Sequence, residues 1–373
     1  MSGLSTVEPA SPLERGEPGA TRRGRGRVLR GPVVALLVVA VFGALPFFDV
    51  AVPVVLPGSV SSPGSLQLLA IALVFAGLAV SYDVIFGYTG LLSFGHALFF
   101  GAGAYLTNLL MGRGIGYVAS AALAVLATAL GAAALGGIAL RARGVAFAMV
   151  TLAYVEAFAI FLLTDPLGFT GGEEGLPLVS EQVPRSLRGV VNTDNLYWLA
   201  LAFAVLAYLL ARFAVTSLAG RVWEAVRENE DRVELLGLRP LGFKLVALTF
   251  ASTLAAAGGA VHLLLLRGAN PDLASADFTL ALLVMVVLGG AGRLWGAAIG
   301  GFLYGLLTLR LPALGASGVL AGLPGPVERV LAEPLFVLGA LFVLLVLFAP
   351  GGVAGFAARV RSAASLRRSP RSP

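Results

Sequence analysis

The sequence predicts an all-α fold, a polytopic bundle of membrane helices. Of 373 residues, 58% are hydrophobic and only 12% are charged, whereas about a quarter of the residues in a soluble domain carry charge. Apolar stretches close to the length of a membrane-crossing helix recur along the chain. Backbone groups in lipid must bond within their own segment, so these stretches are expected to be helices. Many of the 48 glycines fall inside them and predict that some of the helices are interrupted.

About ten membrane-crossing segments are expected from length and hydropathy. The stretches around 90–111 and 277–311 contain glycine breaks, so eight or nine crossings are the alternatives. The ten segments are 32–48, 66–86, 90–111, 116–140, 145–165, 195–215, 243–267, 277–290, 294–311 and 331–349.

Two basic tails are expected to flank a membrane domain at 32–349. Residues 1–31 are rich in Gly, Pro, Ser and Arg, a composition typical of disorder, and residues 350–373 form the second tail. A basic stretch before the apolar run Pro32–Phe48 also fits a signal peptide. That run is long for a signal peptide and lacks a clear small-x-small cleavage site, which favours an uncleaved first span.

Basic residues indicate the orientation, because Lys and Arg accumulate on the cytoplasmic side. With ten spans and a cytoplasmic amino terminus, the cytoplasmic segments hold 20 of the 26 basic residues. Nine spans would place the tail at 350–373 outside and lose this agreement. We therefore expect both termini to be cytoplasmic.

Several classes of chemistry are excluded or disfavoured. The sequence has no cysteine, so thiolate metal sites and cysteine nucleophiles are ruled out. It shows no paired carboxylates, histidine cluster or nucleophile–base set, which disfavours an enzyme and a metal site. A phosphate-binding loop ends in Gly-Lys-Ser/Thr, but the only lysine, Lys244, precedes Leu245. If nucleotide drives this protein, another subunit must hydrolyse it.

One stretch, GRVWEAVRENEDRVELLG at 220–237, is charged at eight of its eighteen positions. It lies in the largest predicted cytoplasmic loop and reads as one amphipathic helix that ends at Gly237. Glu224–Arg227, Arg227–Asp231 and Glu228–Arg232 have the spacing of ion pairs on a helix. Val222, Val226 and Val233 form an apolar stripe beside Trp223. The mixed charge favours a protein partner, and an interfacial helix lying on lipid is the alternative.

The stretch GRVWEAVRENEDRVELLGLRPLGFKLVAL resembles the cytoplasmic ATPase-coupling segment of permease subunits, of the M type, in bacterial ABC importers for branched-chain amino acids. Three further stretches resemble the same family in order: GYTGLLSFGHALFFGAGAY at 87–105, VTLAYVEAF at 150–158 with TGGEEGL at 170–176, and LLVMVVLGGAGRLWGAAIGG at 282–301. The likeness covers about Leu66 to Gly355.

The resemblance implies a multi-pass subunit of the bacterial cytoplasmic (inner) membrane that imports hydrophobic amino acids. It implies a heterodimer with a second permease, two cytoplasmic ATPases that bind ATP and Mg, and an extracellular or periplasmic solute-binding protein. No cofactor is expected in this chain. Urea or short amides remain alternative cargoes. An ion-coupled secondary transporter or channel is the alternative from another class, with Asp83 and Glu156 as its available intramembrane acids.

Three groups of site residues follow from these motifs. The coupling segment, 217–242, is expected to contact the ATPases through Gly220, Arg221, Glu224, Ala225, Arg227, Glu228, Asn229, Glu230, Arg232 and Gly237. The translocation pathway is expected to include Gly87, Gly90, Ser93, Gly95, His96, Gly101, Thr151 and Glu156. The contact with the binding protein is expected at Thr170, Gly171, Gly172 and Glu173, on a flexible acidic loop that could instead be merely solvated.

Alternatives remain open for the pathway glycines, His96 and Glu156, and for Asp83 and His262 outside the three groups. Close helix packing would also explain the glycines and His96. Glu156 lies near the middle of its predicted span, where a carboxylate needs a partner, a proton or an interior position. It could line the passage or make a structural hydrogen bond to a neighbouring helix. Asp83 is a weaker candidate for the same roles, and His262 is expected to be structural.

Overall fold

The computed structural model describes residues 30–50, 56–316 and 351–355, with four single positions between 336 and 343. Most of both predicted tails and the predicted span at 331–349 lie outside these residues. The chain divides into two compact units, Met1–Phe42 and Gly43–Pro373, whose boundary falls inside helix α2 (Arg30–Ala44). In the first unit the described part is the beginning of α2, and the features below belong to the second unit.

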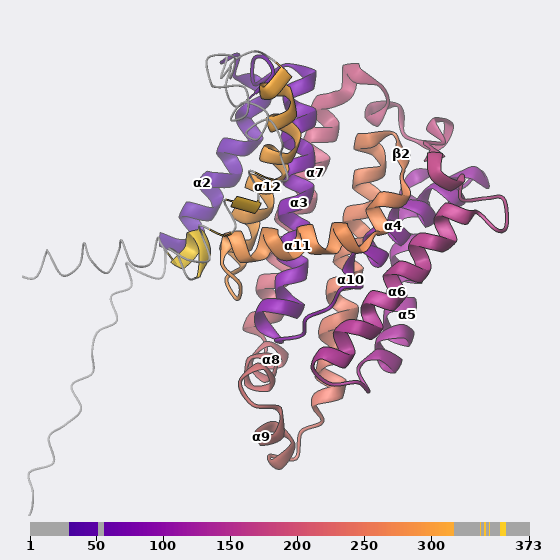
Figure 1. The fold of residues 1–373 in the computed structure, drawn as a ribbon. Coiled ribbons are helices and arrows are strands. Elements are labelled where there is room, and N and C mark those ends of the chain that lie inside the picture. Colours follow the sequence, from indigo (N-terminus) through magenta and orange to yellow (C-terminus); the bar gives the residue numbers. More distant parts are fainter. Residues whose placement is uncertain are drawn as a thin grey trace, which may run out of the picture. The chain divides into compact units, whose positions relative to one another are not determined.

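The second unit is helical, which confirms the predicted all-α class (Figure 1). Its only strands among the described residues are the two-residue segments β1 (Leu176–Pro177) and β2 (Gly268–Ala269). Its helices are α3 (Pro63–Asp83), α4 (His96–Gly112), α5 (Tyr117–Ala139), α6 (Val145–Thr164), α7 (Thr193–Thr216), α8 (Leu218–Glu228), α9 (Glu230–Leu235), α10 (Pro240–Leu266), α11 (Ala276–Gly289) and α12 (Leu294–Ala316).

Six helices in the described part of the chain are long and apolar enough to cross a membrane: α3, α5, α6, α7, α10 and α12. The predicted crossing at 277–290 is not supported, because α11 has only 14 residues. At a rise of about 1.5 Å per residue it spans about 21 Å, less than a hydrocarbon core of about 30 Å. Figure 1 shows α11 lying crosswise to the long helices. The predicted crossing at 90–111 is also shorter than expected, since α4 begins only at His96.

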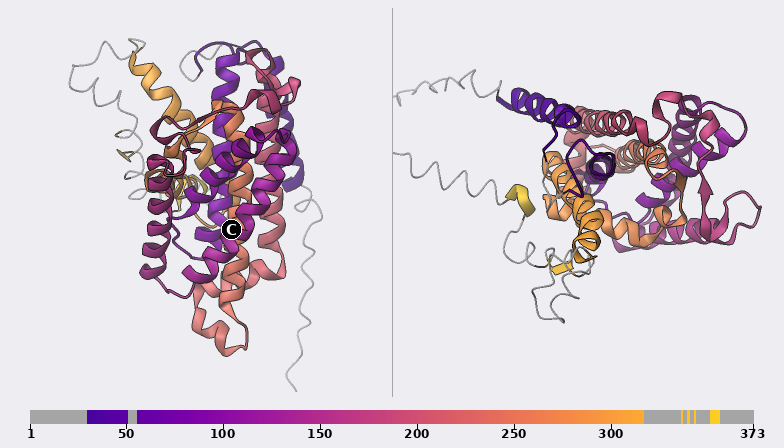
Figure 2. Two further views of the ribbon diagram at one scale, coloured as in Figure 1. Left: turned by 90° about the vertical axis from the view of Figure 1, so that its right-hand side faces the viewer. Right: turned by 90° about the horizontal axis from the view of Figure 1, so that it is seen from above.

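Helices α3 and α10 form the core of the unit. In their most apolar windows 94% and 78% of the residues are buried, against 22% for α5 and 33% for α6. Seen from above, α3 appears nearly end-on among other helices (Figure 2). A helix that is apolar all round and surrounded by helices is a core element, whereas α5 and α6 keep apolar faces on the outside of the chain.

Side-chain caps set where several helices begin. Ser62 accepts a hydrogen bond from Ser65 N at the start of α3 (3.4 Å), and Pro63 occupies the first turn. Ser275 accepts one from Phe278 N (3.2 Å) at the start of α11. Such caps satisfy amide groups that have no partner within the helix.

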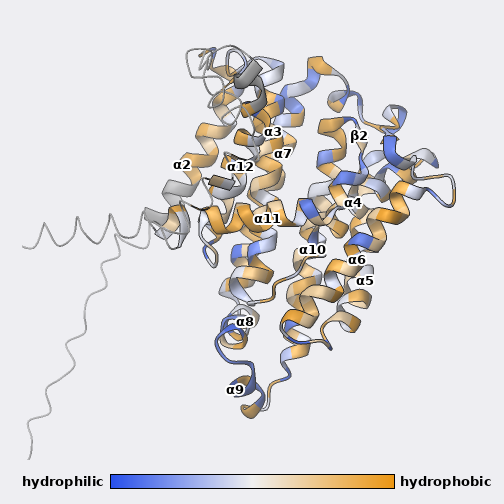
Figure 3. Cartoon of the chain, viewed as in Figure 1, coloured by the Kyte–Doolittle hydropathy of each residue, from blue (hydrophilic) through white to orange (hydrophobic). Residues whose placement is uncertain are grey.

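The two ends of the bundle differ in polarity. Figure 3 shows hydrophilic α8 and α9 at one end, beyond the hydrophobic bodies of the long helices. At the other end β1 pairs with β2, with Leu176 opposite Ala269. Asn108 of α4 clamps the residues around β1, because its amide donates to Pro177 O (2.9 Å) and accepts from Val179 N (3.1 Å).

Candidate functional site

The helical structure is interrupted between α3 and α4, at residues 84–95. This interruption, called the break below, is the centre of the candidate site. Helix α3 loosens into a π-helical turn at Val84–Tyr88, and regular structure resumes only at His96. A break inside an apolar bundle requires new partners for the freed backbone groups. Four side chains provide them: Tyr82 donates to Ser93 O (2.9 Å), Thr151 accepts from Phe94 N (3.0 Å), Ser93 accepts from Gly95 N (3.3 Å), and Thr279 accepts from Ala97 N (3.2 Å).

The glycines of the motif at 87–105 have two different roles. Gly90 has a φ of +75°, which favours glycine, and it lies within the break. Gly101 and Gly103 lie inside a continuous α4 instead. A Cβ at Gly101 would lie 2.7 Å from that of Ala274, and one at Gly103 would collide with the backbone of Ala256. These two glycines therefore allow close helix packing, which is the alternative that the sequence analysis left open for the glycines.

His96 is fully buried and hydrogen-bonded to the core. Its Nε2 lies 2.9 Å from Ser81 Oγ, and its ring contacts Tyr82 with a centroid separation of 5.3 Å. Its Nδ1 has no hydrogen-bond partner among the described residues. The imidazole thus fixes the start of α4 against α3. His262 is buried as well and stacks on Phe75, which fits its expected structural role.

The charged stretch at 220–237 is not the single helix that the sequence predicts. Asn229 is extended, with a φ of −162° and a ψ of 104°, and it separates α8 from α9. Its side chain caps α9 by accepting from Arg232 N (2.9 Å). The predicted Arg227–Asp231 and Glu228–Arg232 pairs assumed a continuous helix across this position, and neither is found. The predicted Glu224–Arg227 pair lies within α8 and is not found either, since Arg227 bonds to Gly87 O instead. Gly237 does end α9, with a φ of +81°.

The apolar stripe of this segment packs against its own chain, where Val226 and Val233 are buried and Val222 is half-buried. Trp223 is 1% exposed and Val233 is 2% exposed, and the Trp223 ring nitrogen donates to Phe243 O (2.8 Å) in α10. Gly220 lies directly against the backbone of Val215, so it serves packing. The remaining predicted coupling residues are exposed, with Glu230 half-buried: Arg221, Glu224, Ala225, Arg227, Glu228, Asn229, Arg232 and Gly237.

Although Arg227 is exposed as a residue, its guanidinium reaches into the break. It donates to Gly87 O, and its stem would meet a Cβ at Gly90 at 2.9 Å. Beside it, the buried Asp83 accepts from Gly292 N (2.8 Å). Arg227 and Asp83 therefore bring α8, the break and the α11–α12 connection into one cluster.

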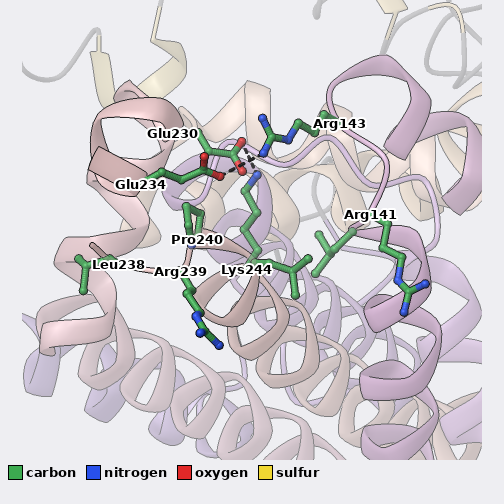
Figure 4. Close-up of a pocket in the computed structure, with 10 residues that line it drawn as sticks. Arg141, Arg143, Glu230, Glu234, Leu238, Arg239, Pro240 and Lys244 are labelled. Carbon is green, nitrogen blue, oxygen red and sulfur yellow. Dashed lines mark hydrogen bonds and ion pairs between the residues drawn. The ribbon is translucent and has the colours of Figure 1, made fainter. Parts of the chain in front are cut away.

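Ion pairs attach α9 to the rest of the chain around a pocket of about 420 Å³ (Figure 4). Lys244 of α10 pairs with Glu230 (2.6 Å), and Arg143 of the α5–α6 connection pairs with Glu234 (3.1 Å). Figure 4 shows these side chains converging, while Arg141 points away from them. The α5–α6 connection therefore lies at the same end as α8 and α9, in agreement with the predicted sidedness.

The predicted acidic loop is more ordered than the sequence suggests. Asp165 accepts hydrogen bonds from three successive amides, Phe169 N (2.7 Å), Thr170 N (2.8 Å) and Gly171 N (3.1 Å). These bonds, that of Thr170 first, lower the pKa of its carboxyl. Thr170 is 1% exposed and serves the turn. Gly171 and Glu173 are exposed and Gly172 is half-exposed, so they remain accessible to a partner.

Glu156 lies apart from the cluster. Its side chain is on the exposed face of α6, whereas Thr151 on the same helix is buried and bonded to the break. Glu156 therefore faces away from the interior of this chain, and a role inside its own bundle is not supported.

Comparison with known proteins identifies the family. The profile described as the permease component of the branched-chain amino acid transport system matches residues 64–347. The chain belongs to this family of membrane transport permeases.

Curated relatives in the family cover most of the chain. It is 31% identical to the high-affinity branched-chain amino acid transport system permease protein LivM of Salmonella typhimurium and 30% identical to that of Escherichia coli K12, each over 287 residues. These alignments cover 70% of this chain and 63% of each relative. A probable LivM of Methanocaldococcus jannaschii is 27% identical over 208 residues, covering 55% of this chain and 58% of that protein. No solved structure matches.

The sequence does not predict several members of the cluster. Tyr82 and Thr279 appear as ordinary residues of apolar stretches, and Gly292 appears as one of a series of helix-packing glycines. The partners of Thr279 and Gly292 lie 182 and 209 residues away, and that of Tyr82 lies 11 residues away across the break, so no helical spacing indicates them. The inward position of Arg227 could be found only by recognising Asn229 as a helix cap.

Proposed function

We propose that this permease is the membrane subunit of an ATP-binding-cassette importer that moves branched-chain amino acids into the cell across the bacterial inner membrane. Family membership and the names of the relatives support branched-chain amino acids as the cargo. ATP hydrolysis must take place in another subunit, because this sequence has no Gly-Lys-Ser/Thr phosphate-binding loop. Two cytoplasmic ATPase subunits therefore bind ATP and Mg and hydrolyse the nucleotide.

The arrangement of α8 and α9 carries this proposal. The segment is held to α10 by Trp223 on its inner side and by the Lys244–Glu230 pair. Its outer side presents Glu224, Glu228 and Arg232 to solvent. A segment that is bonded to α10 on one side and exposes charged side chains on the other can bind a partner protein and transmit the partner's movement to the bundle.

A second permease is the expected neighbour of α6. A carboxylate near the middle of a membrane helix costs about 2.5–3.5 kcal/mol when it faces lipid, so such groups almost always find protein or water. Among the described residues Glu156 has no hydrogen-bond or ion-pair partner. We propose that the second permease covers this face of α6, with a hydrogen-bond donor opposite Glu156.

A solute-binding protein is proposed to dock at the opposite end, on the turn that Asp165 organises. Gly171 and Glu173 are exposed there on a turn whose backbone is fixed by hydrogen bonds. A fixed turn loses little conformational entropy on binding. Delivery by such a protein would place most of the cargo selection outside this chain.

The test uses the complex of both permeases and both ATPases in sealed vesicles with the binding protein. Glu228→Ala combined with Arg232→Ala is expected to weaken ATPase association and leucine uptake together. Glu181→Ala with Arg185→Ala, exposed charges at the other end, should leave ATPase association intact. Normal association and uptake in the first pair would contradict the assignment. Uptake that depends on an ion gradient and not on ATP would indicate a secondary transporter, and uptake of urea in place of leucine would indicate the amide cargo.

A further inference from the structure

We propose that Arg227 is a positioning residue that links the cytoplasmic helix α8 to the break between α3 and α4, rather than a residue that contacts the ATPases. This inference rests on the proposed function, and it concerns how movement passes from α8 into the bundle. The sequence groups Arg227 with the charged outer surface of its helix. The structure places its guanidinium on the inner side.

The first step is the contact between Arg227 and the break. Gly87 lies in the π-helical turn, and its carbonyl accepts from Nη1 of Arg227. A charged donor makes a stronger hydrogen bond than a neutral one. The stem of Arg227 lies against Gly90, where a Cβ would come within 2.9 Å of Cγ. Movement of α8 would therefore act on the backbone of the break at two points.

The second step is the connection to α12. The Arg227 guanidinium also lies near Gly292, where a Cβ would be 3.0 Å from Nη1. The amide of Gly292 donates to the Asp83 carboxylate, which is completely buried and whose second oxygen has no hydrogen-bond partner among the described residues. The guanidinium of Arg227 and the carboxyl group of Asp83 thus meet at the same glycine. Three segments thus depend on one side chain.

The third step concerns what the break can do. Its backbone is bonded to α3 through Tyr82, to α6 through Thr151 and to α11 through Thr279. A displacement passed to the break by Arg227 would therefore reach several helices at once. Coupling between sites requires such a continuous set of contacts together with an element that has two arrangements. The irregular segment is the natural candidate for that element.

The experiment compares Arg227→Gln with Arg141→Gln, since Arg141 is an exposed arginine in the α5–α6 connection at the same end of the bundle and is not among the expected coupling residues. Both variants are assembled with the second permease and both ATPases in vesicles. We expect the Arg227 variant to keep its ATPase subunits and basal ATP hydrolysis but to lose uptake per ATP hydrolysed by about tenfold, the scale of a typical coupling free energy. The Arg141 variant should match the wild type in both measurements.

A second readout detects the movement itself. Leu92, in the break, is 37% exposed, and the chain has no cysteine of its own, so Leu92→Cys provides a single reporter thiol. ATP binding is expected to change its labelling rate in the otherwise wild-type complex and to leave it unchanged when Arg227→Gln is added. Arg227→Lys, which keeps the charge and a donor, should restore part of the response.

Two outcomes would overturn the proposal. If Arg227→Gln releases the ATPases, Arg227 is a docking residue. If the thiol response and the uptake per ATP persist, Arg227 does not transmit the movement. Should the Gln variant fail to assemble, the Lys variant decides, because full uptake with an unaltered thiol response would dismiss a requirement for the guanidinium. Failure of the proposed function itself would appear separately, as uptake in the wild-type complex that does not depend on ATP.

Discussion

Lys244 and Glu230 form a short ion pair, 2.6 Å between Nζ and Oε2, whose side chains are only 9% and 27% exposed. This pair joins the start of α10 to α9. Removing one member of a shielded pair leaves the other charge poorly solvated.

We expect Lys244→Met to destabilise the permease by on the order of 1–3 kcal/mol, between the values for surface and fully buried pairs. The thermal unfolding midpoint of the purified protein measures this loss. The matched change, Arg143→Met, removes a pair whose side chains are 64% and 44% exposed, and it should cost less than about 1 kcal/mol. Equal losses in the two variants would contradict this ranking.

The hydrogen bonds of Asp165 predict a pH dependence of the turn that follows α6. Because hydrogen bonds from the turn lower the pKa of its folded carboxyl, the carboxylate stabilises the turn above the unfolded pKa, about 3.9. This contribution disappears as the pH falls through the folded value. The protection of the amides at 169–171, measured as the exchange rate relative to that of an unstructured chain at the same pH, should therefore be high at neutral pH and should be lost in strong acid.

Asp165→Ala should remove the protection of these amides at every pH, while Glu173→Ala, an exposed change in the same turn, should keep the wild-type profile. Protection in Asp165→Ala at neutral pH would show that the carboxylate does not order the turn.

The close contact between α4 and α10 at Gly103 predicts that no larger residue fits at this position. A Cβ there would collide with the backbone of Ala256, so Gly103→Ala must push α4 away from α10. Overpacking of this kind costs about 1–3 kcal/mol. In Gly131→Ala on α5 the new methyl group meets nothing within 4 Å, and the variant should gain about 0.5–1 kcal/mol from helix propensity. Thermal unfolding of both variants tests the prediction, which would be wrong if Gly103→Ala were as stable as the wild type.

Glu156 predicts opposite effects in the isolated chain and in the complex. Glu156→Leu removes a charge that faces lipid when the chain is alone, so the single subunit should keep or gain stability. The same change removes the proposed bond to the second permease, so assembly should weaken. A spin label at Ala153→Cys should lose accessibility to oxygen only when the second permease is present. Unchanged accessibility would place the interface elsewhere.

The long helices could be predicted from the sequence because length and hydropathy determine them locally. The segments 116–140 and 145–165 match α5 and α6 within a few residues. Hydropathy does not show how a helix is oriented relative to its neighbours, however. The apolar sequence of α11 therefore predicted a membrane crossing, although α11 lies crosswise to the long helices.

The site was predictable only in part. Its motifs mark the break and the charged segment, and the buried stripe around Trp223 follows from spacing. The pairing of Arg227 with Asp231 failed because one extended residue, Asn229, ends the helix between them. The bond from Arg227 to Gly87 joins positions 140 residues apart, which periodicity cannot detect. Glu156 lies in the middle of an apolar stretch, where a charged residue is expected to face the interior. Only the fold shows that it lies on the exposed face of α6.

The strand pair at the end of the bundle opposite α8 and α9 has a mechanical consequence. Leu176 of β1 lies in the connection that follows α6, and Ala269 of β2 lies directly after α10, so their pairing joins the segments that follow these two helices. Asn108 of α4 bonds to the residues around β1 and adds a third helix to this assembly. A movement at this end that keeps these hydrogen bonds would carry the paired segments and α4 together.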